Sequence, residues 1–292
     1  MALGALQHDP GPLYPPALEL FLGLLRCPTC RTRHLHPGRG ALRCPVGHTF
    51  DIARHGYAGL LTGTRATSGD DAAMVQARNR FLSTGAYAPI RDLGASLAAD
   101  ADAEQATVVD VGCGTGYYLA GVLDRLPGAR GLGLAPSVRA LRSAARAHDR
   151  AAAVAWDVFR PFPLADGVAD VVLDVFAPRN PAEFHRVLRP TGRLIVVRPI
   201  ERHLAELRDR LPSMVTIDPA KEQRLHRALD PFFEGTVTEH VEYTTSLAGV
   251  DALDLVAMTP NARHVSRADL NHDGLLPDEV TVSVLATAYQ PR

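Results

Sequence analysis

The segment TVVDVGCGTGYY, residues 107–118, limits the fold more than any other part of this 292-residue chain. A β-branched run is followed by Asp110 and by three glycines at alternate positions, Gly112, Gly114 and Gly116. Glycines at this spacing let the chain turn sharply after a strand and let its backbone approach a ligand at the start of a helix. The segment therefore predicts a strand, a ligand-binding turn and a helix.

Downstream of this segment, short β-branched runs alternate with helix-length segments, which is the pattern of βαβ units and a mostly parallel sheet. The seven predicted strands span residues 107–111, 130–134, 151–155, 168–175, 193–198, 237–245 and 279–288. We expect the last two to form an antiparallel pair. Upstream, two helices are predicted on either side of a break at residues 85–89. The predicted fold class is α/β.

A Cys/His cluster near the N-terminus is a second constraint. Cys27 and Cys30 form a C-x2-C pair, and after thirteen residues Cys44 and His48 form a C-x3-H pair. Three clustered cysteines beside a histidine favour a metal over a disulfide framework, and four such ligands suit tetrahedral zinc. Four protein ligands leave no open position, so the zinc is expected to be structural. The alternative is a set of buried thiols with an incidental histidine. Two other histidines compete for the fourth position, His34 and His36.

The order of Asp110 and the three glycines, D-x-G-x-G-x-G, resembles motif I of S-adenosylmethionine methyltransferases, where the acid helps to orient the loop around the methionine portion. A nicotinamide-dinucleotide domain is the competing interpretation. Such methyltransferases usually carry a ribose-binding acid at the end of the second strand, but this chain has Ala135 there. The missing charge-assisted hydrogen bonds are worth about 1.5–3 kcal/mol. Asp157, near the end of the third strand, is a candidate for the adenine amino group or a solvated loop residue.

Several segments carry a more specific resemblance. They are HTFDIARHGYAGLL (48–61), GDDAAMVQARNRFLSTGAYAP (69–89), VDVGCGTGYYLA (109–120), DVFAPRNPAEFHRVLRPTGRLIVVRP (174–199), RHLAEL (202–207), AMTP (257–260) and VTVSV (280–284). From about residue 26 to the C-terminus, the chain is similar to the ribosomal RNA guanine-N1 methyltransferase family, and especially to its tylosin-resistance branch.

The resemblance implies a small zinc-ribbon-like domain joined to a Rossmann-like, seven-stranded S-adenosylmethionine methyltransferase domain. It also implies a homodimer whose cleft accepts a 23S ribosomal RNA hairpin, with resistance to macrolide-type antibiotics as the outcome. By position it assigns cofactor contacts to Tyr87, Gly116, Tyr118, Leu119 and His203. Without the resemblance, Tyr87 would be interpreted as a core tyrosine and His203 as a helix-capping histidine.

Methyl transfer to guanine N1 needs orientation, desolvation and an acceptor for the N1 proton. Candidates lie at the end of the fourth predicted strand, where Asp174 stands in the strand and Arg179 and Asn180 follow to hold the base edge. Asp174 could instead be a strand residue that faces a helix terminus, and no residue stands out as the base. A base in a hairpin must be unstacked or looped out, and the arginines of the metal module are a candidate RNA clamp, with solvated side chains as the alternative. These arginines are Arg26, Arg31, Arg33, Arg43 and Arg54.

The expected organisation is a flexible extension over residues 1–25, a zinc-binding domain over 26–64, a helical linker over 65–104 and the methyltransferase domain over 105–292. A net charge of −1 does not by itself predict binding to RNA phosphates. We find no membrane or secretion signal, so a cytoplasmic protein that does not associate with membranes is expected.

Three positions depart from the family pattern. They are Ala135, Gly59 where asparagine is usual, and NARH (261–264) where a tryptophan is usual. These departures and the near-neutral charge leave two alternatives open. The first is a methyltransferase of the same scaffold that acts on a small-molecule natural product, and the second is a non-catalytic binding protein.

Overall fold

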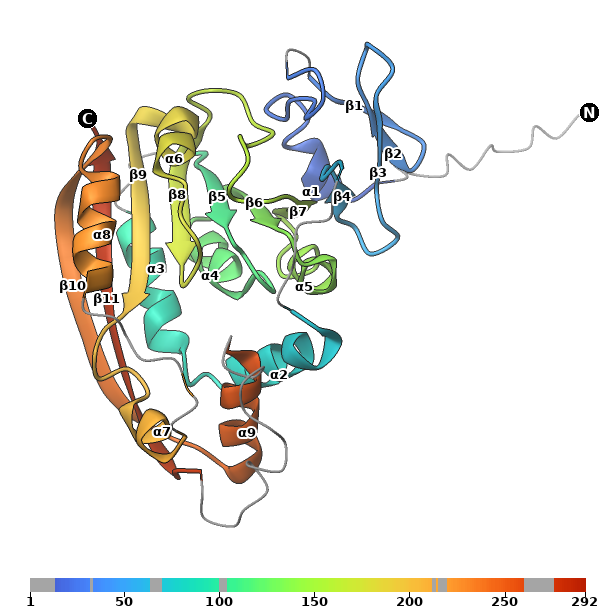
Figure 1. Ribbon diagram of the computed structural model, residues 1–292. Coiled ribbons are helices and arrows are strands. Elements are labelled where there is room, and N and C mark those ends of the chain that lie inside the picture. The colour runs from blue at the N-terminus through green and yellow to red at the C-terminus, as the bar shows by residue number, and fades with distance from the viewer. Residues whose placement is uncertain are drawn as a thin grey trace, which may run out of the picture.

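The computed structural model describes residues 14–31, 34–63, 70–99, 104–211, 214, 220–259 and 276–292. Within them, an eight-stranded sheet has the order β10-β11-β9-β8-β5-β6-β7-β4, and a separate small sheet has the order β1-β2-β3 (Figure 1). The strands of the large sheet are β4 (Ala58–Gly59), β5 (Thr107–Val111), β6 (Arg130–Ala135), β7 (Ala151–Ala155), β8 (Ala169–Val175), β9 (Leu188–Pro199), β10 (Phe233–Ser246) and β11 (Glu279–Pro291). Those of the small sheet are β1 (His36–Gly38), β2 (Ala41–Arg43) and β3 (Thr49–Asp51).

The seven predicted strands are present as β5 to β11. The strands β5 to β9 run parallel to one another, β11 pairs antiparallel with β9, and β10 pairs antiparallel with β11 as predicted. The predicted break at residues 85–89 also exists, because α2 ends at Ser83 and α3 begins at Ala88. The sequence pattern therefore predicted β5 to β11 of the large sheet correctly.

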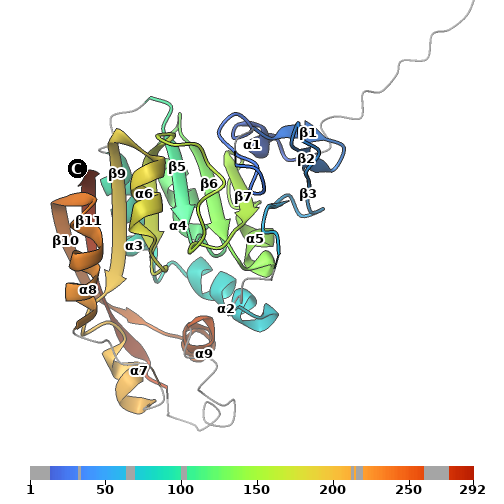
Figure 2. The ribbon, with the colours of Figure 1, turned by 45° about the horizontal axis from the view of Figure 1, so that its top comes forward.

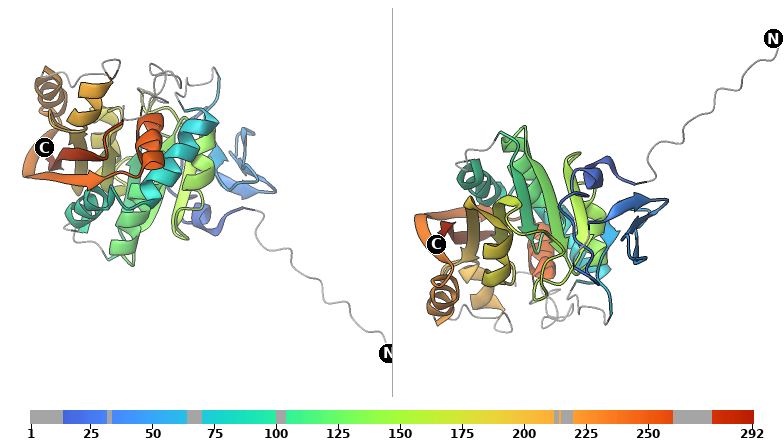
Figure 3. Two further views of the ribbon diagram at one scale, coloured as in Figure 1. Left: turned by 90° about the horizontal axis from the view of Figure 1, so that it is seen from below. Right: turned by 90° about the horizontal axis from the view of Figure 1, so that it is seen from above.

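Helices cover both faces of this sheet (Figures 1 and 2). Successive strand residues point to opposite faces, so Val171 and Leu173 join the core under α3 and α4, whereas Val172 joins the core under α6 and α8. Beyond the carboxyl ends of the parallel strands, α2 and α9 lie side by side (Figure 3). The helices are α1 (Pro16–Glu19), α2 (Ala72–Ser83), α3 (Ala88–Ala99), α4 (Tyr117–Arg125), α5 (Val138–Ala144), α6 (Pro181–Val187), α7 (Ala205–Arg210), α8 (Ala220–Leu229) and α9 (Gly249–Met258).

Residues 14–25 are part of the packed structure, which corrects the expectation of a flexible extension for this stretch. Leu18, Phe21 and Leu25 are each fully buried in the core beside β6 and β7. Residues 1–13 lie outside the described residues. The abundance of proline and glycine near the N-terminus hid an apolar spacing that forms only a short helix and its following turns.

The metal module, which is the zinc-binding domain expected over residues 26–64, is joined to the large sheet by backbone hydrogen bonds. Ala58 and Gly59 of β4 pair in parallel with Val154 and Ala155 of β7. The sheet therefore has one strand more than predicted, because a two-residue strand is too short to produce a recognisable alternation. No helix among the described residues is long and apolar enough to cross a membrane.

Candidate functional site

The loop between β5 and α4 forms a cradle of bare backbone. Gly112, Gly114 and Gly116 have φ angles of 76°, 53° and 83°, in the left-handed region that favours glycine. A β-carbon at Gly112 would lie 2.5 Å from Cβ of Ala177, and one at Gly116 would lie 2.9 Å from Cα of Ala144. Side chains are therefore excluded at both positions, and the loop enters α4 as bare backbone, whose N–H groups are of the kind that bind ligands at a helix start.

Asp110, at the end of β5, is a buried carboxylic acid directly before this loop. Its side chain is 2% exposed, and Oδ2 has no hydrogen-bond partner in the described part of the chain. Burial raises the pKa of Asp110 to about 7, because the charged form loses its hydration. An unsatisfied buried oxygen of this kind is suited to accept a hydrogen bond from a ligand.

Aromatic side chains gather beside the cradle. The ring centroid of Phe176 lies 6.4 Å from that of Tyr87, 6.2 Å from that of Tyr118 and 5.8 Å from that of His203. Tyr87 and His203 are buried and approach each other with 3.4 Å between Oη and Nε2. Leu119 is also fully buried, so its side chain belongs to the core beneath the loop. The structure thus brings together the aromatic residues that the resemblance had assigned to the cofactor site.

His203 has a defined protonation state. The backbone N–H of Ser283 donates to Nδ1 at 3.2 Å, so the proton of the neutral ring lies on Nε2 and points toward Tyr87. Burial, with a smaller contribution from Arg208, lowers the pKa of His203 to about 4. The ring is therefore neutral near pH 7 and serves as a donor at Nε2.

Phe176 is a site residue that the sequence analysis missed. Its φ of +55° is unusual for a bulky residue, and a backbone of this kind costs about 1–3 kcal/mol. The residue is 39% exposed although it directly follows the buried strand β8. An aromatic residue immediately after a buried strand, in FAP, was the available signal.

The end of β6, where the ribose-binding acid was expected, is covered by the metal module. Ala135 is 3% exposed and belongs to a small apolar cluster against which Tyr57 and Leu61 pack. Ser137, two residues on, accepts a hydrogen bond from the N–H of Ala140 and so caps α5. The alanine thus fits an apolar contact between the two parts of the chain.

Asp157 lies in the loop after β7 and is partly buried. Its Oδ1 accepts a hydrogen bond from the N–H of Phe159 at 3.0 Å, and its Oδ2 is 3.9 Å from Nε of Arg160. The carboxylate therefore stabilises the conformation of this loop.

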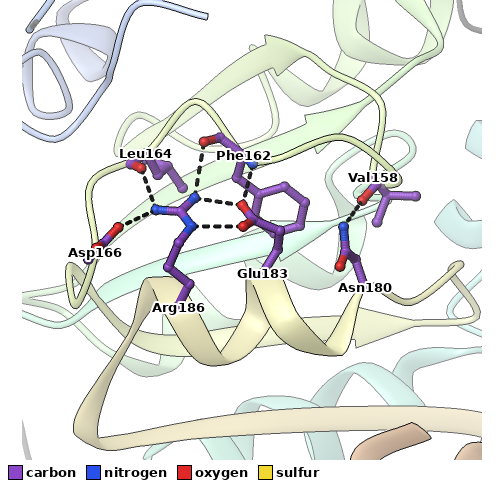
Figure 4. Close-up of polar contacts among 7 residues, drawn as sticks. All are labelled: Val158, Phe162, Leu164, Asp166, Asn180, Glu183 and Arg186. Atoms are coloured by element: carbon purple, nitrogen blue, oxygen red, sulfur yellow. Dashed lines mark hydrogen bonds and ion pairs between the residues drawn. The ribbon is translucent and has the colours of Figure 1, made fainter. Parts of the chain in front are cut away.

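The three catalytic candidates have contacts inside the protein. Asp174 is fully buried, and its Oδ1 lies 3.1 Å from Nε of Arg179. The amide nitrogen of Asn180 donates to the carbonyl oxygen of Val158 at 2.9 Å, so it joins the start of α6 to the neighbouring loop (Figure 4). These positions favour a structural role for Asp174 and Asn180 in this conformation.

The four predicted metal ligands converge. One ligand atom from each of Cys27, Cys30, Cys44 and His48 lies within 4.8 Å of all the others. Sγ of Cys27 is 3.4 Å from Nδ1 of His48, and Sγ of Cys30 is 3.5 Å from Sγ of Cys44. Zinc bonds of about 2.0–2.3 Å in a tetrahedron place ligand atoms roughly 3.5 Å apart, so the donor set fits zinc.

The competing histidine His34 is engaged elsewhere. Its Nδ1 lies 2.6 Å from Nη1 of Arg26. The backbones of the same two residues also form an isolated antiparallel β-bridge. At the second knuckle, Gly47 has a φ of 103°, which allows the tight turn between Cys44 and His48.

A groove of about 920 Å³ lies between the metal module and the loop over residues 156–166. Trp156, at its wall, is 4% exposed, and its Nε1 has no partner in the described residues. The arginines that line the groove are Arg26, Arg31, Arg160 and Arg186.

The protein satisfies the whole guanidinium of Arg186 (Figure 4). Its five N–H donors reach both carboxylate oxygens of Glu183, Oδ1 of Asp166 and the carbonyl oxygens of Phe162 and Leu164. Arg186 therefore holds the groove wall against α6 and has no N–H left for a ligand.

Two family models match the chain. The model described as "RlmA, N-terminal", a zinc ribbon, matches residues 25–65, and the model described as "Methyltransferase domain" matches residues 108–192. Together with the glycine cradle and the convergent Cys/His cluster, these matches make the chain an S-adenosylmethionine-dependent methyltransferase with a structural zinc ribbon.

Full-length relatives narrow this class. A protein of Streptomyces fradiae named 23S rRNA (guanine(748)-N(1))-methyltransferase is 44% identical over 273 residues, which cover 91% of this chain and 96% of that protein. A protein of Micromonospora griseorubida, named as a candidate 23S rRNA (guanine-N(1)-)-methyltransferase, is 43% identical over 288 residues and is covered to 97%. The chain therefore belongs to the 23S rRNA (guanine-N1)-methyltransferase family, which confirms the resemblance found in the sequence.

Proposed function

We propose that this protein methylates N1 of a guanine in a hairpin of 23S ribosomal RNA, at a position equivalent to that of its Streptomyces fradiae relative. The observation that carries this proposal is the exposed ring of Phe176 directly beside the glycine cradle, because it offers a surface for a flat base next to the cofactor loop. Antibiotic resistance of the macrolide type is the expected consequence of such a modification.

The cofactor side of the site is supported by the buried groups around the loop. S-adenosylmethionine would supply a methyl group from its sulfonium, with S-adenosylhomocysteine as the second product and the guanine N1 proton released to solvent. The backbone at Gly112, Gly114 and Gly116 lets the methionine portion approach, and Asp110 offers an unsatisfied oxygen beside it. The remaining proposed contacts come from Tyr87, Tyr118, Leu119, Asp157 and His203.

Phe176 is proposed to stack on the target base, because stacking on an aromatic ring is the usual way to hold an unstacked base. Its strained backbone keeps the ring at the end of β8 rather than in the core. Neutral His203 and Tyr87 pack behind this ring.

The groove beside the zinc ribbon is the proposed path of the flanking RNA. Arg31 is exposed at its rim, and Arg160 is held at the groove by a hydrogen bond of 2.8 Å to the carbonyl oxygen of Thr62 and by its contact with Asp157. Guanidinium groups of this kind suit phosphate oxygens. Of the other clamp candidates, Arg43 and Arg54 are exposed or partly exposed on the module, and Arg33 lies outside the described residues.

We also propose that Cys27, Cys30, Cys44 and His48 hold one structural zinc. We further propose that the protein forms a homodimer whose two subunits share the RNA cleft. It is proposed to act in the cytoplasm, where ribosomal RNA is present. The dimer would be checked by light scattering of the purified protein with and without the RNA hairpin.

The function is tested by incubating the protein with methyl-labelled cofactor and a transcript of the 23S hairpin. We expect one labelled guanine, mapped by a stop of reverse transcription, and no label in a transcript whose target guanine is already methylated at N1. Phe176→Leu should lower the rate of labelling while leaving the affinity for S-adenosylhomocysteine within about twofold. Label in a small-molecule extract but not in RNA would replace this proposal with the natural-product alternative, for which the net charge of −1 is the supporting observation.

A further inference from the structure

Arg78 of α2 lies over the middle of the glycine cradle. A β-carbon at Gly114 would lie 3.7 Å from Nη1 and 4.0 Å from Cδ of Arg78, so the side chain occupies the side of the loop toward which Gly114 faces. The charge of Arg78 also acts on Tyr118, where it opposes the rise in pKa that burial causes. Arg78 is thus close both to the cradle and to the aromatic residues beside it.

The guanidinium of Arg78 is held in a fixed orientation. Nη1 and Nη2 donate to the two carboxylate oxygens of Asp70 at 3.0 and 3.2 Å, and Nη2 also donates to the carbonyl oxygen of Met258 at 3.0 Å. The side chain is 21% exposed. A planar group that is fixed in this way loses little conformational entropy when it binds a ligand.

The donors of Arg78 are only partly used. A guanidinium has five N–H donors, and three are taken by Asp70 and Met258. In the described part of the chain, Nε–H and one N–H of Nη1 have no acceptor, and Nη1 is the nitrogen nearest to the loop. This contrasts with Arg186, whose five donors are all satisfied.

We propose that Arg78 binds the α-carboxylate of the amino-acid portion of S-adenosylmethionine and of the product S-adenosylhomocysteine. The carboxylate accepts from the unused N–H of Nη1, the nitrogen nearest to the loop, and from the loop backbone, while Asp110 offers an acceptor to the ammonium group. The amino-acid portion is then recognised as a zwitterion between a cationic and an acidic side chain. This inference rests on the cofactor assignment and deepens it, because it names the group that distinguishes the amino-acid end.

A purely structural role is the competing explanation, since Arg78 connects α2 with α9 through Met258. Arg80 provides a matched control on the same helix. Its Nε and Nη2 donate to both oxygens of Asp254 in α9 at 2.7 and 2.6 Å, so it also joins the two helices. No atom of Arg80 is among the three nearest to an added β-carbon at any of the cradle glycines.

The test measures binding by calorimetry with two probes, S-adenosylhomocysteine and its decarboxylated analogue, which keeps the amine but lacks the carboxylate. Wild-type protein should prefer S-adenosylhomocysteine by about 10- to 100-fold, the range of charge-assisted hydrogen bonds. Arg78→Met should abolish most of this preference and leave the affinity for the decarboxylated analogue within about threefold. Arg78→Lys should restore part of the preference, because a single positive charge remains.

Arg80→Met should lower thermal stability but keep the full preference for the carboxylate. If Arg78→Met weakens both probes equally, or if wild-type protein binds both probes equally, the inference is overturned while the cofactor assignment stands. If wild-type protein binds neither probe, both fall together. The wild-type comparison and Arg78→Lys keep the proposal falsifiable even if Arg78→Met fails to fold.

Discussion

The backbone N–H of Ser283 in β11 donates a 3.2 Å hydrogen bond to Nδ1 of His203, in the wall of the proposed cofactor site. This bond requires the ring to be unprotonated at Nδ1, and burial agrees with it by lowering the pKa of His203 to about 4. A histidine that titrates below its unfolded value destabilises the fold as the pH falls, because the unfolded chain binds the proton first.

His203→Gln is therefore expected to change the pH dependence of stability. As the pH falls from 6.5 to 4, protonation of His203 in the unfolded chain should lower the wild-type free energy of unfolding by roughly 3 kcal/mol. Above pH 6.5 this residue should cause no pH dependence of stability. Thermal unfolding at several pH values is the measurement, and the curve of the variant should be flatter in this window. Parallel curves for both proteins would contradict the assigned protonation state.

Asp110 is expected to change the stability with pH in the direction opposite to that of His203. Burial raises its pKa to about 7, so its contribution to stability is full below about pH 4 and is lost as the pH rises through 7. Asp110→Asn should be more stable than wild type at pH 8, by about 2–4 kcal/mol in free energy of unfolding, and should bind S-adenosylhomocysteine more weakly. Chemical denaturation at pH 5 and pH 8 tests this, since the advantage of the variant should shrink at the lower pH.

Gly112→Ala tests the cradle. The new β-carbon would lie 2.5 Å from Cβ of Ala177 in addition to requiring a φ of 76°, so binding of S-adenosylhomocysteine should be lost or reduced more than tenfold. Gly85→Ala is the matched control, because it has a φ of 82° with open space around it. The control should lose only about 1–2 kcal/mol of stability and should keep its affinity. Equal losses of affinity in both variants would show that the close approach at Ala177 is unimportant.

Cys44→Ser tests the metal centre. We expect one zinc per chain in the wild-type protein by elemental analysis, and less than about a tenth of that in the variant, with a lower unfolding temperature. Cys113→Ser is the comparison, because Cys113 is a buried thiol in the glycine loop and stands outside the cluster. Zinc retained after loss of Cys44, or lost after loss of Cys113, would disprove the ligand set.

The parts predicted well from sequence are those whose signal is local. The strands β5 and β8 to β11 contain β-branched residues in runs, whereas β6 and β7 are short apolar segments rich in glycine, leucine or alanine. The cradle and the Cys/His pairs depend on spacings of two to four residues. The zinc cluster converges because each pair already forms one turn, so only the meeting of two turns had to be inferred.

The parts that were missed depend on contacts between distant segments. Asp174, a candidate catalytic acid, lies 3.1 Å from Arg179 in a buried ion pair, and no spacing reveals this contact or which way a strand residue faces at the end of a sheet. The position of Arg78 over Gly114 likewise follows from how α2 lies across the strand ends. Phe176 was passed over because its exposure follows from an unusual φ rather than from its residue type.

The two-residue strand β4 also covers part of the edge of β7, where another molecule could otherwise pair. It pairs along β7, whose sequence AAAVA is wholly buried in the folded protein. Edges of apolar strands are the places where sheets of different molecules join. Without zinc, unfolding of the zinc ribbon would remove β4 and expose the edge of β7. Aggregation of the protein is therefore an expected early consequence of zinc depletion.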